Sequence, residues 1–344
     1  MNQTQNYNDT TTITNEPLTK YSPNTGTCFN KNIKHFIPGF AKQFQDSFCY
    51  ANIIQFLIVG LMYYKVGYGT YWKILIIAAF SGCIASLLEN GTVAFICLPS
   101  QKDNNSIVVP FLIDEIFWTT QQFSVPILNL IKMQVLVKKR TAEMMKHIIF
   151  FFLIVFIFFR GFIGYERMMR GYLVDDKINI LHGFAFGTIA MVDMFCTISI
   201  LYLIRKQGNN ESSASVVTQQ VKYSSYTILI CVDVVETLLS IFDIFANVGI
   251  PEEVLDASIV IPFQCLMSNF ILILATDILL MRYESHRNSQ MILDNNNQTS
   301  LSGLPTIKSN NTNSKDLVKK IKKSQYYYNE SINIRNDRNL SFSE

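Results

Sequence analysis

Charged residues are scarce in this 344-residue sequence. Asp, Glu, Lys and Arg make up 16% of it, against roughly 25% in soluble domains. The four histidines stand alone, so no HxxxH pair predicts a bound metal, and no Cys-rich ligand spacing is present. A Gly-rich phosphate loop and a GxSxG nucleophile elbow are also lacking. These absences argue against an enzyme, a nucleic-acid-binding protein and a bound cofactor.

Residues 1–46 contain neither a basic n-region nor an apolar h-region, so we expect no secretory signal peptide. The first membrane helix is then expected to act as the targeting signal. A light-sensing opsin is disfavoured as well, because the last apolar stretch offers no Lys for a retinal Schiff base and its ionisable residue is Asp277.

Long apolar blocks fill the middle of the chain. A spanning helix needs about 20 mainly apolar residues, and seven stretches qualify. They are Ser47–Tyr64, Ile74–Leu98, Ile107–Val137, His147–Tyr165, Ile178–Ile204, Tyr223–Ile250 and Val254–Met281. The third is either a long tilted helix from Ile107 or a shorter one from Ile116. Pro126 and Pro262 are expected to kink the third and seventh. The sequence predicts an all-α membrane protein, a seven-transmembrane helix bundle of the plasma membrane.

Lys and Arg are distributed unequally between the predicted loops. Residues 138–146 and 205–222 are rich in them, and Lys65 and Lys73 flank the first loop, whereas the alternate loops hold fewer or balance them with acids. Cytoplasmic loops carry the excess of Lys and Arg. An odd number of helices then places the N-terminus outside and the C-terminus inside.

Polar tails flank the predicted bundle. We expect an extracellular, largely disordered tail at 1–46, a transmembrane domain at 47–285 and a disordered cytoplasmic tail at 286–344, with a short basic amphipathic segment at 316–323. Sequons at Asn2, Asn8 and Asn104 lie on the predicted outer side and predict a glycoprotein. The cysteines Cys28, Cys49 and Cys97 are those placed to meet outside.

Ionisable residues inside the apolar stretches carry most of the chemical information, because each is costly in hydrocarbon. Counting along the helices brings several to one level in the outer half, and we take them as a ligand-binding set. It comprises Glu89, Asp114, Glu115, Arg160, His182, Glu236, Asp243 and Asn247. Asp193 and Asp233 lie deeper and are candidates for a switch or relay.

Two interpretations of this outer set remain open. In one, the carboxylates bind the amine of a small cationic or zwitterionic ligand. In the other, Arg160 pairs with Glu89 or Asp114 and the cluster is structural. The excess of acids over Arg160, counted as the one embedded base, favours the first.

Seven helices, an outer N-terminus with sequons, short loops, a basic second cytoplasmic loop and a long Ser/Thr-rich inner tail together resemble a G-protein-coupled receptor. The resemblance is one of topology: the third stretch ends in Gln134–Arg140, where the rhodopsin-like family has an acidic-Arg-Tyr triplet. It implies a receptor for a small molecule or peptide that signals to a heterotrimeric G protein or another cytoplasmic transducer. The expected contacts are Lys138, Lys139, Arg140, Lys146, Arg205 and Lys206.

The alternative is a proton- or cation-coupled transporter or channel. It would use the intramembrane acids as a relay. These are Glu89, Asp193, Asp233, Glu236 and Asp243.

Overall fold

A computed structural model describes most of the chain between residues 18 and 283. The described ranges are 18–46, 49–67, 69–104, 106–136, 139–208, 216–247, 260–280 and 282–283. These ranges contain helices and no strand. The predicted tail at 286–344, with its basic segment at 316–323, lies outside them.

The helices follow one another with short connections. In chain order they are η1 (Pro23–Thr25), α1 (Phe36–Asp46), α2 (Cys49–Val66), α3 (Thr70–Ile96), η2 (Pro99–Gln101), α4 (Pro110–Gln122), α5 (Ser124–Leu136), α6 (Lys139–Arg170), α7 (Asp176–Gly208), α8 (Val216–Asn247) and α9 (Val260–Met267). A further apolar helix, Phe270–Leu280, follows α9.

Four helices are long and apolar enough to cross a membrane. They are α2, α3, the stretch Arg140–Arg170 of α6 and the stretch Asp176–Ser199 of α7. At 1.5 Å per residue, 20 residues span the roughly 30 Å of hydrocarbon. The expectation of a helical, membrane-embedded protein is confirmed to this extent.

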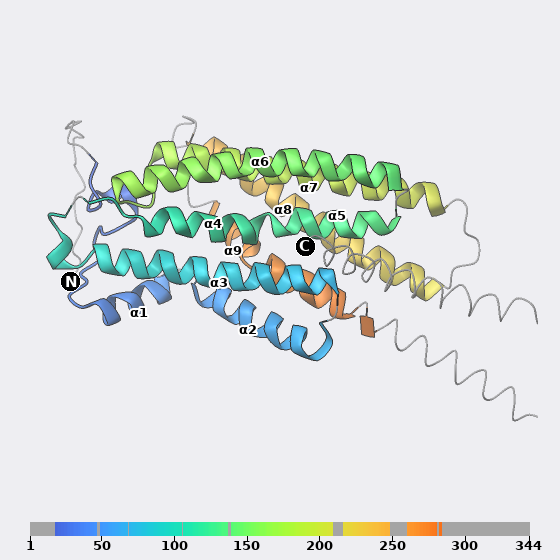
Figure 1. The fold of residues 1–344 in the computed structure, drawn as a ribbon, viewed down its shortest axis with the longest axis horizontal. Helices are drawn as coiled ribbons and strands as arrows, with labels where there is room; N and C mark the ends of the chain where they lie inside the picture. Colours follow the sequence, from blue (N-terminus) through green and yellow to red (C-terminus); the bar gives the residue numbers. More distant parts are fainter. Residues whose placement is uncertain are drawn as a thin grey trace, which may run out of the picture.

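The helices run side by side along the long axis of the molecule (Figure 1). Over an apolar window of 18 residues in each span, 56% of the residues are buried in α3 and in α7, against 22% in α2 and 28% in α6. The large apolar side chains of α6, such as Phe151 and Phe158, instead point outward and are about 60% exposed (62% and 59%). An outward apolar face of this kind suits lipid rather than water, so α3 and α7 form the centre and α2 and α6 the periphery.

The third predicted span is broken into two helices. α4 and α5 lie end to end in one line (Figure 1), with Phe123 between them. The expected long tilted helix is thus interrupted three residues before Pro126, whose ring nitrogen cannot donate to the carbonyl of Gln122.

The last predicted span is broken as well, but not at its proline. Pro262 lies in the first turn of α9, where a proline is tolerated. The interruption comes at Ser268 and Asn269, whose side chains donate to the carbonyl of Cys265 over 2.8 and 2.9 Å. Such side-chain bonds compete with the helical ladder.

Glycines let neighbouring helices approach closely. A Cβ atom on Gly183 of α7 would lie 2.8 Å from Cγ1 of Ile244, and one on Gly187 would lie 3.1 Å from Oγ of Ser240. This Gly-x-x-x-Gly pair faces α8, as small residues do where membrane helices meet. The close contact brings the acids of α7 and α8 together.

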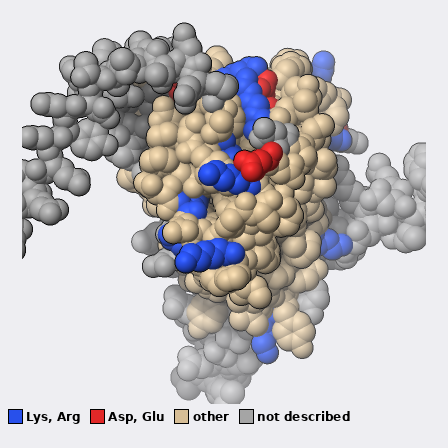
Figure 2. Space-filling view, turned by 90° about the vertical axis from the view of Figure 1, so that its left-hand side faces the viewer, with Lys and Arg blue, Asp and Glu red and all other residues tan. Residues whose placement is uncertain are grey.

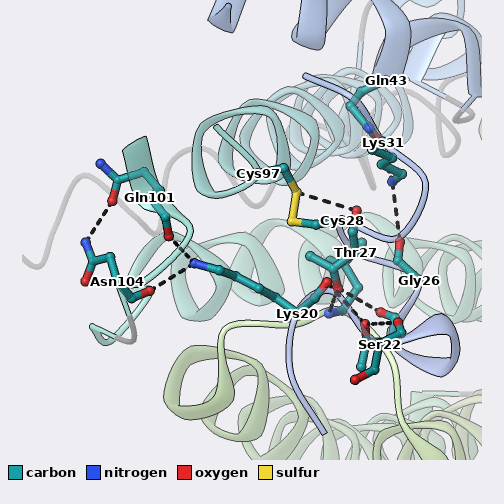
Figure 3. The surroundings of a disulfide bond; sticks show 12 residues. Lys20, Ser22, Gly26, Thr27, Cys28, Lys31, Gln43, Cys97, Gln101 and Asn104 are labelled. Carbon is teal, nitrogen blue, oxygen red and sulfur yellow. Dashed lines mark hydrogen bonds between the residues drawn. A yellow bond between two sulfur atoms is a disulfide. The ribbon is translucent and has the colours of Figure 1, made fainter. Parts of the chain in front are cut away.

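The N-terminal segment is structured from residue 18, which differs from the expected disordered tail over 1–46. A disulfide joins Cys28 to Cys97 at the end of α3 (Figure 3). Lys20 donates through Nζ to the carbonyls of Gln101 and Asn104. The hydroxyl of Thr27 accepts the backbone N–H of Leu173 over 2.8 Å. The cross-link and these bonds supply the order that composition alone does not predict.

Candidate functional site

A cavity of about 290 Å³ lies between the helices, towards the end that carries the N-terminal segment. It is lined by residues of every helix from α2 to α9 and of the helix after α9. The polar lining includes Asn52, Glu89, Gln121, Gln122, Arg160, Arg167, Asn179, His182, Glu236, Gln264 and Ser268. Four of the predicted ligand-binding residues therefore share one cavity, namely Glu89, Arg160, His182 and Glu236.

Glu115 binds two arginines of α6 at once. Its Oε2 lies 2.7 Å from Nη1 of Arg160, and its Oε1 lies 2.8 Å from Nη1 of Arg167. All three side chains are buried, with 9% exposure or less. Arg160 and Arg167 lie seven residues apart and so share a face of α6. Gly164 lies between them, and a Cβ there would be 3.1 Å from Cγ of Glu115, so its absence leaves room for this carboxylate.

Arg167 makes three further contacts in addition to its ion pair with Glu115. Its Nη1 also lies 3.3 Å from Oε2 of Glu89, its Nε donates to the carbonyl of Leu173 over 2.9 Å, and its Nη2 lies 3.1 Å from Nε2 of His182. Because Arg has only donors, Nε2 of His182 must accept, and the ring is the neutral tautomer with its hydrogen on Nδ1. Arg167 thus connects the cavity to the loop held by Thr27.

The pairing differs from the structural alternative that the sequence left open, in which Arg160 binds Glu89 or Asp114. Arg160 pairs with Glu115 and with Oε1 of Gln122, and not with Glu89 or Asp114. Asp114, which is 0% exposed, accepts the indole N–H of Trp118 over 3.2 Å and lies within hydrogen-bonding reach of Glu89. Adjacent residues of a helix point about 100° apart, so Asp114 and Glu115 have different partners.

Glu236 of the cavity lining, on α8, lies beside two acids outside the lining, Asp193 of α7 and Asp233 of α8. Asp193 is 0% exposed and accepts Nδ2 of Asn129 over 2.9 Å. Glu236 is 5% exposed, lines the cavity and lies within hydrogen-bonding reach of Asp193. Asp233 accepts the hydroxyl of Thr197. One oxygen of each acid has no hydrogen-bond donor.

Arg160 is not the only embedded base. Lys132 of α5 pairs with Asp277 at 3.1 Å, and both side chains are 11% exposed or less. Sequence analysis overlooked Lys132, although it stands inside the predicted third span between Ile131 and Met133. Arg167 is likewise 7% exposed, where a position in an outer loop was expected.

The end of the molecule above the cavity carries further ion pairs. Figure 2 looks onto this end and shows Lys and Arg beside Asp and Glu. Arg170 pairs with Glu166 and with Asp175, and Lys177 pairs with Glu166. The acids are buried, but Arg170 and Lys177 are 36% and 57% exposed, so water screens these pairs and each contributes little to stability.

Some predicted residues are not placed. The side chains of Asp243 and Asn247 lie outside the described residues, as do those of Lys138, Lys139, Arg205 and Lys206. Arg140 and Lys146 are exposed at the start of α6. Within the described ranges, no group of three or more His, Cys, Asp or Glu is arranged to hold a metal ion.

Comparison with known proteins leaves the site to be interpreted from its own geometry. No family model, curated protein or solved structure matches the chain.

Proposed function

We propose that the protein is a receptor of the membrane that binds a small amine-bearing ligand, cationic or zwitterionic, in the cavity. The observation that carries the proposal is that the cavity presents polar atoms of both kinds without partners. Oε2 of Glu236 has no donor, and Nε of Arg160 and Nδ1 of His182 have no acceptor. Buried polar groups are costly when they lack hydrogen-bond partners. A ligand that supplies these partners would therefore gain binding free energy.

The chemistry of these atoms matches an amine that also carries an oxygen. An ammonium group would donate to Glu236, and an oxygen of the ligand would accept from Arg160 and His182. The volume of about 290 Å³ is at the lower end of the roughly 300–1,000 Å³ usual for ligand pockets. It suits a compact ligand.

The disulfide supports the predicted orientation. Disulfides persist in oxidising compartments and are rare in the cytosol, and Cys28–Cys97 lies at the same end as the cavity. We place this end, with the N-terminus, outside and the C-terminus inside at the plasma membrane. α4 with α5, α8, and α9 with Phe270–Leu280 then join the four apolar spans as a seven-helix bundle.

Helix breaks at the cavity supply a route from binding to signalling. Gln121 and Gln122, which end α4, and Ser268, which follows α9, all line the cavity beside the interruptions. Hinges are a few element-terminal residues that absorb a change in backbone angles. A ligand that favours one arrangement of these breaks would shift the bundle between two states and alter a cytoplasmic surface for a G protein or another transducer.

The proposal is tested by ligand binding and transducer recruitment together. Purified protein is screened for thermal stabilisation by small amines, amino alcohols and amino acids. Arg160→Gln is expected to abolish the stabilisation. Replacing residues 138–140 by Ala is expected to leave binding unchanged and to weaken recruitment of the transducer. Absence of stabilisation by every compound of the screen would contradict the proposal.

A transporter is the second candidate, because buried polar residues continue beyond the cavity. Asp193 and Asp233 lie below Glu236, and the Lys132–Asp277 pair follows on α5 and the last helix. A relay needs such continuity. Uptake or current in proteoliposomes that is lost in Asp193→Asn would favour this candidate over the receptor.

A further inference from the structure

Two pairs of carboxyl groups flank the cavity in the same manner. Glu236 reaches Asp193, and Glu89 reaches Asp114. In each pair the Glu lines the cavity and the Asp is 0% exposed behind it. Two ionised carboxylates in contact repel each other strongly where water is excluded. A buried pair of carboxyl groups therefore shares a proton.

The unpaired oxygens of the Asp193–Glu236 pair indicate where that proton lies. Oδ1 of Asp193 is occupied by Nδ2 of Asn129, whereas Oδ2 of Asp193 and Oε2 of Glu236 have no donor. Both are acceptors unless one carries hydrogen. A proton held between the two carboxyls satisfies both groups.

The two pairs differ in their positive partners. Glu89 lies 3.3 Å from Nη1 of Arg167, so it is the ionised member, and Asp114 is left as the hydrogen donor. None of the ion pairs in the described part of the chain involves Asp193 or Glu236. The negative charge of the Asp193–Glu236 pair is therefore balanced by the shared proton and by no basic side chain in contact with it. Another cation can take the place of this proton.

Among the described residues, the charged and titratable groups that face the pair supply no uncommitted positive charge that could replace the shared proton. Asp233 comes from α8, Cys196 from α7 and Lys132 from α5, where Lys132 already pairs with Asp277. Arg160 lines the same cavity from α6 and is bound by Glu115. A third carboxyl nearby makes ionisation of both members of the pair still less favourable.

We propose that Glu236 is the ammonium subsite of the cavity and that an entering ammonium ion displaces the proton shared with Asp193. This rests on the proposed function and narrows its ligand to a cation with a neutral oxygen. One positive charge enters, one proton leaves Glu236 or Asp193 for water, and the charge of the site is unchanged. Arg160 and Arg167 are already neutralised by Glu115 and Glu89, so a ligand carboxylate gains little there.

The shared proton is tested first without any ligand. Infrared spectra of the full chain in lipid nanodiscs at neutral pH report protonated carboxyl groups. We expect Asp193→Asn and Glu236→Gln to remove the same carboxyl band, because each leaves a single ionised acid beside an amide. Asp114→Asn, the matched control, is expected to remove a different band. Separate bands for Asp193 and Glu236, or no band lost in either variant, would overturn the proposal.

The exchange is tested with two probes of equal chain length, 3-aminopropanol as its ammonium ion and the zwitterion β-alanine. The ammonium ion is expected to remove the shared band, and its affinity to fall about tenfold per pH unit below the titration of the pair, as linkage to one proton requires. β-Alanine is expected to bind more weakly. Glu236→Gln is expected to abolish the pH dependence.

The outcomes separate this inference from the proposed function. If 3-aminopropanol or β-alanine binds in the cavity but the shared band persists and affinity does not follow pH, the exchange is wrong and the proposed function stands. If no amine or amino acid binds at all, both are wrong.

Discussion

Replacing Glu115 by Gln is expected to destabilise the protein far more than replacing its neighbour Asp114 by Asn. Both side chains are buried on α4, at 2% and 0% exposure. Glu115 is ionised between Arg160 and Arg167. An amide at this position keeps one acceptor for one guanidinium and turns an NH₂ group towards the other.

The magnitude follows from the charge count of the outer network. Arg160 and Arg167 balance Glu115 and Glu89 if Asp114 holds a proton. Glu115→Gln leaves one buried positive charge without a partner, a change that costs about 3–5 kcal/mol. Asp114→Asn leaves the count unchanged, because its amide can accept from Trp118 and donate to Glu89 as the acid does. We expect it to cost under about 1 kcal/mol.

Thermal unfolding of the purified variants checks this comparison. At roughly 2–4 °C per kcal/mol for a domain of this size, Glu115→Gln is expected to lower Tm by about 6–20 °C and Asp114→Asn by only a few degrees. Equal losses in the two variants, or a larger loss for Asp114→Asn, would show that Asp114 is ionised and that the charge count is wrong.

Three further predictions concern the contact between α7 and α8, the disulfide and the orientation of the chain in the membrane. Gly183→Ala is expected to lower Tm, because its Cβ would press on Ile244, whereas Gly91→Ala, with nothing within 4 Å, is expected to be neutral or stabilising by up to about 1 kcal/mol. Cys28→Ser is expected to cost about 2–5 kcal/mol, measured as a Tm loss that reducing agent reproduces in the wild type. An epitope at Thr4 is expected to be accessible on intact cells and one at Ser343 only after permeabilisation.

Hydrophobic patterning predicted the helices well because burial in lipid depends mainly on composition over about 20 residues. The predicted stretch Ile178–Ile204 lies within α7, and Ile74–Leu98 overlaps α3 almost completely. Ends were less accurate: α6 extends beyond His147–Tyr165 on both sides. The break at Phe123 lies beside Pro126, where a kink was expected, whereas the break at Ser268 and Asn269, away from Pro262, was not predicted.

Counting residues along the sequence gives the heights of the candidate site residues in the bundle, but not the directions in which their side chains point. Counting residues gives the height of a side chain along its helix, and Glu89, Arg160 and His182 do meet at one level in the cavity. Which of two acids meets an arginine depends on the rotation of each helix about its axis, which the sequence of one helix does not specify. Asp114 and Glu115 show this, since they share a height and have different partners.

The excess of acids seen in the sequence has a different meaning once the partners are known. Glu115 and Glu89 are matched by Arg160 and Arg167, and Asp277 is matched by Lys132. The unmatched acids are those with no base in contact, and of these Glu236 is the one that lines the cavity. The proposed selectivity for a cation over a zwitterion rests on this imbalance. A cation would take the place of the shared proton, whereas a zwitterion would also add a carboxylate that the already paired arginines could not neutralise.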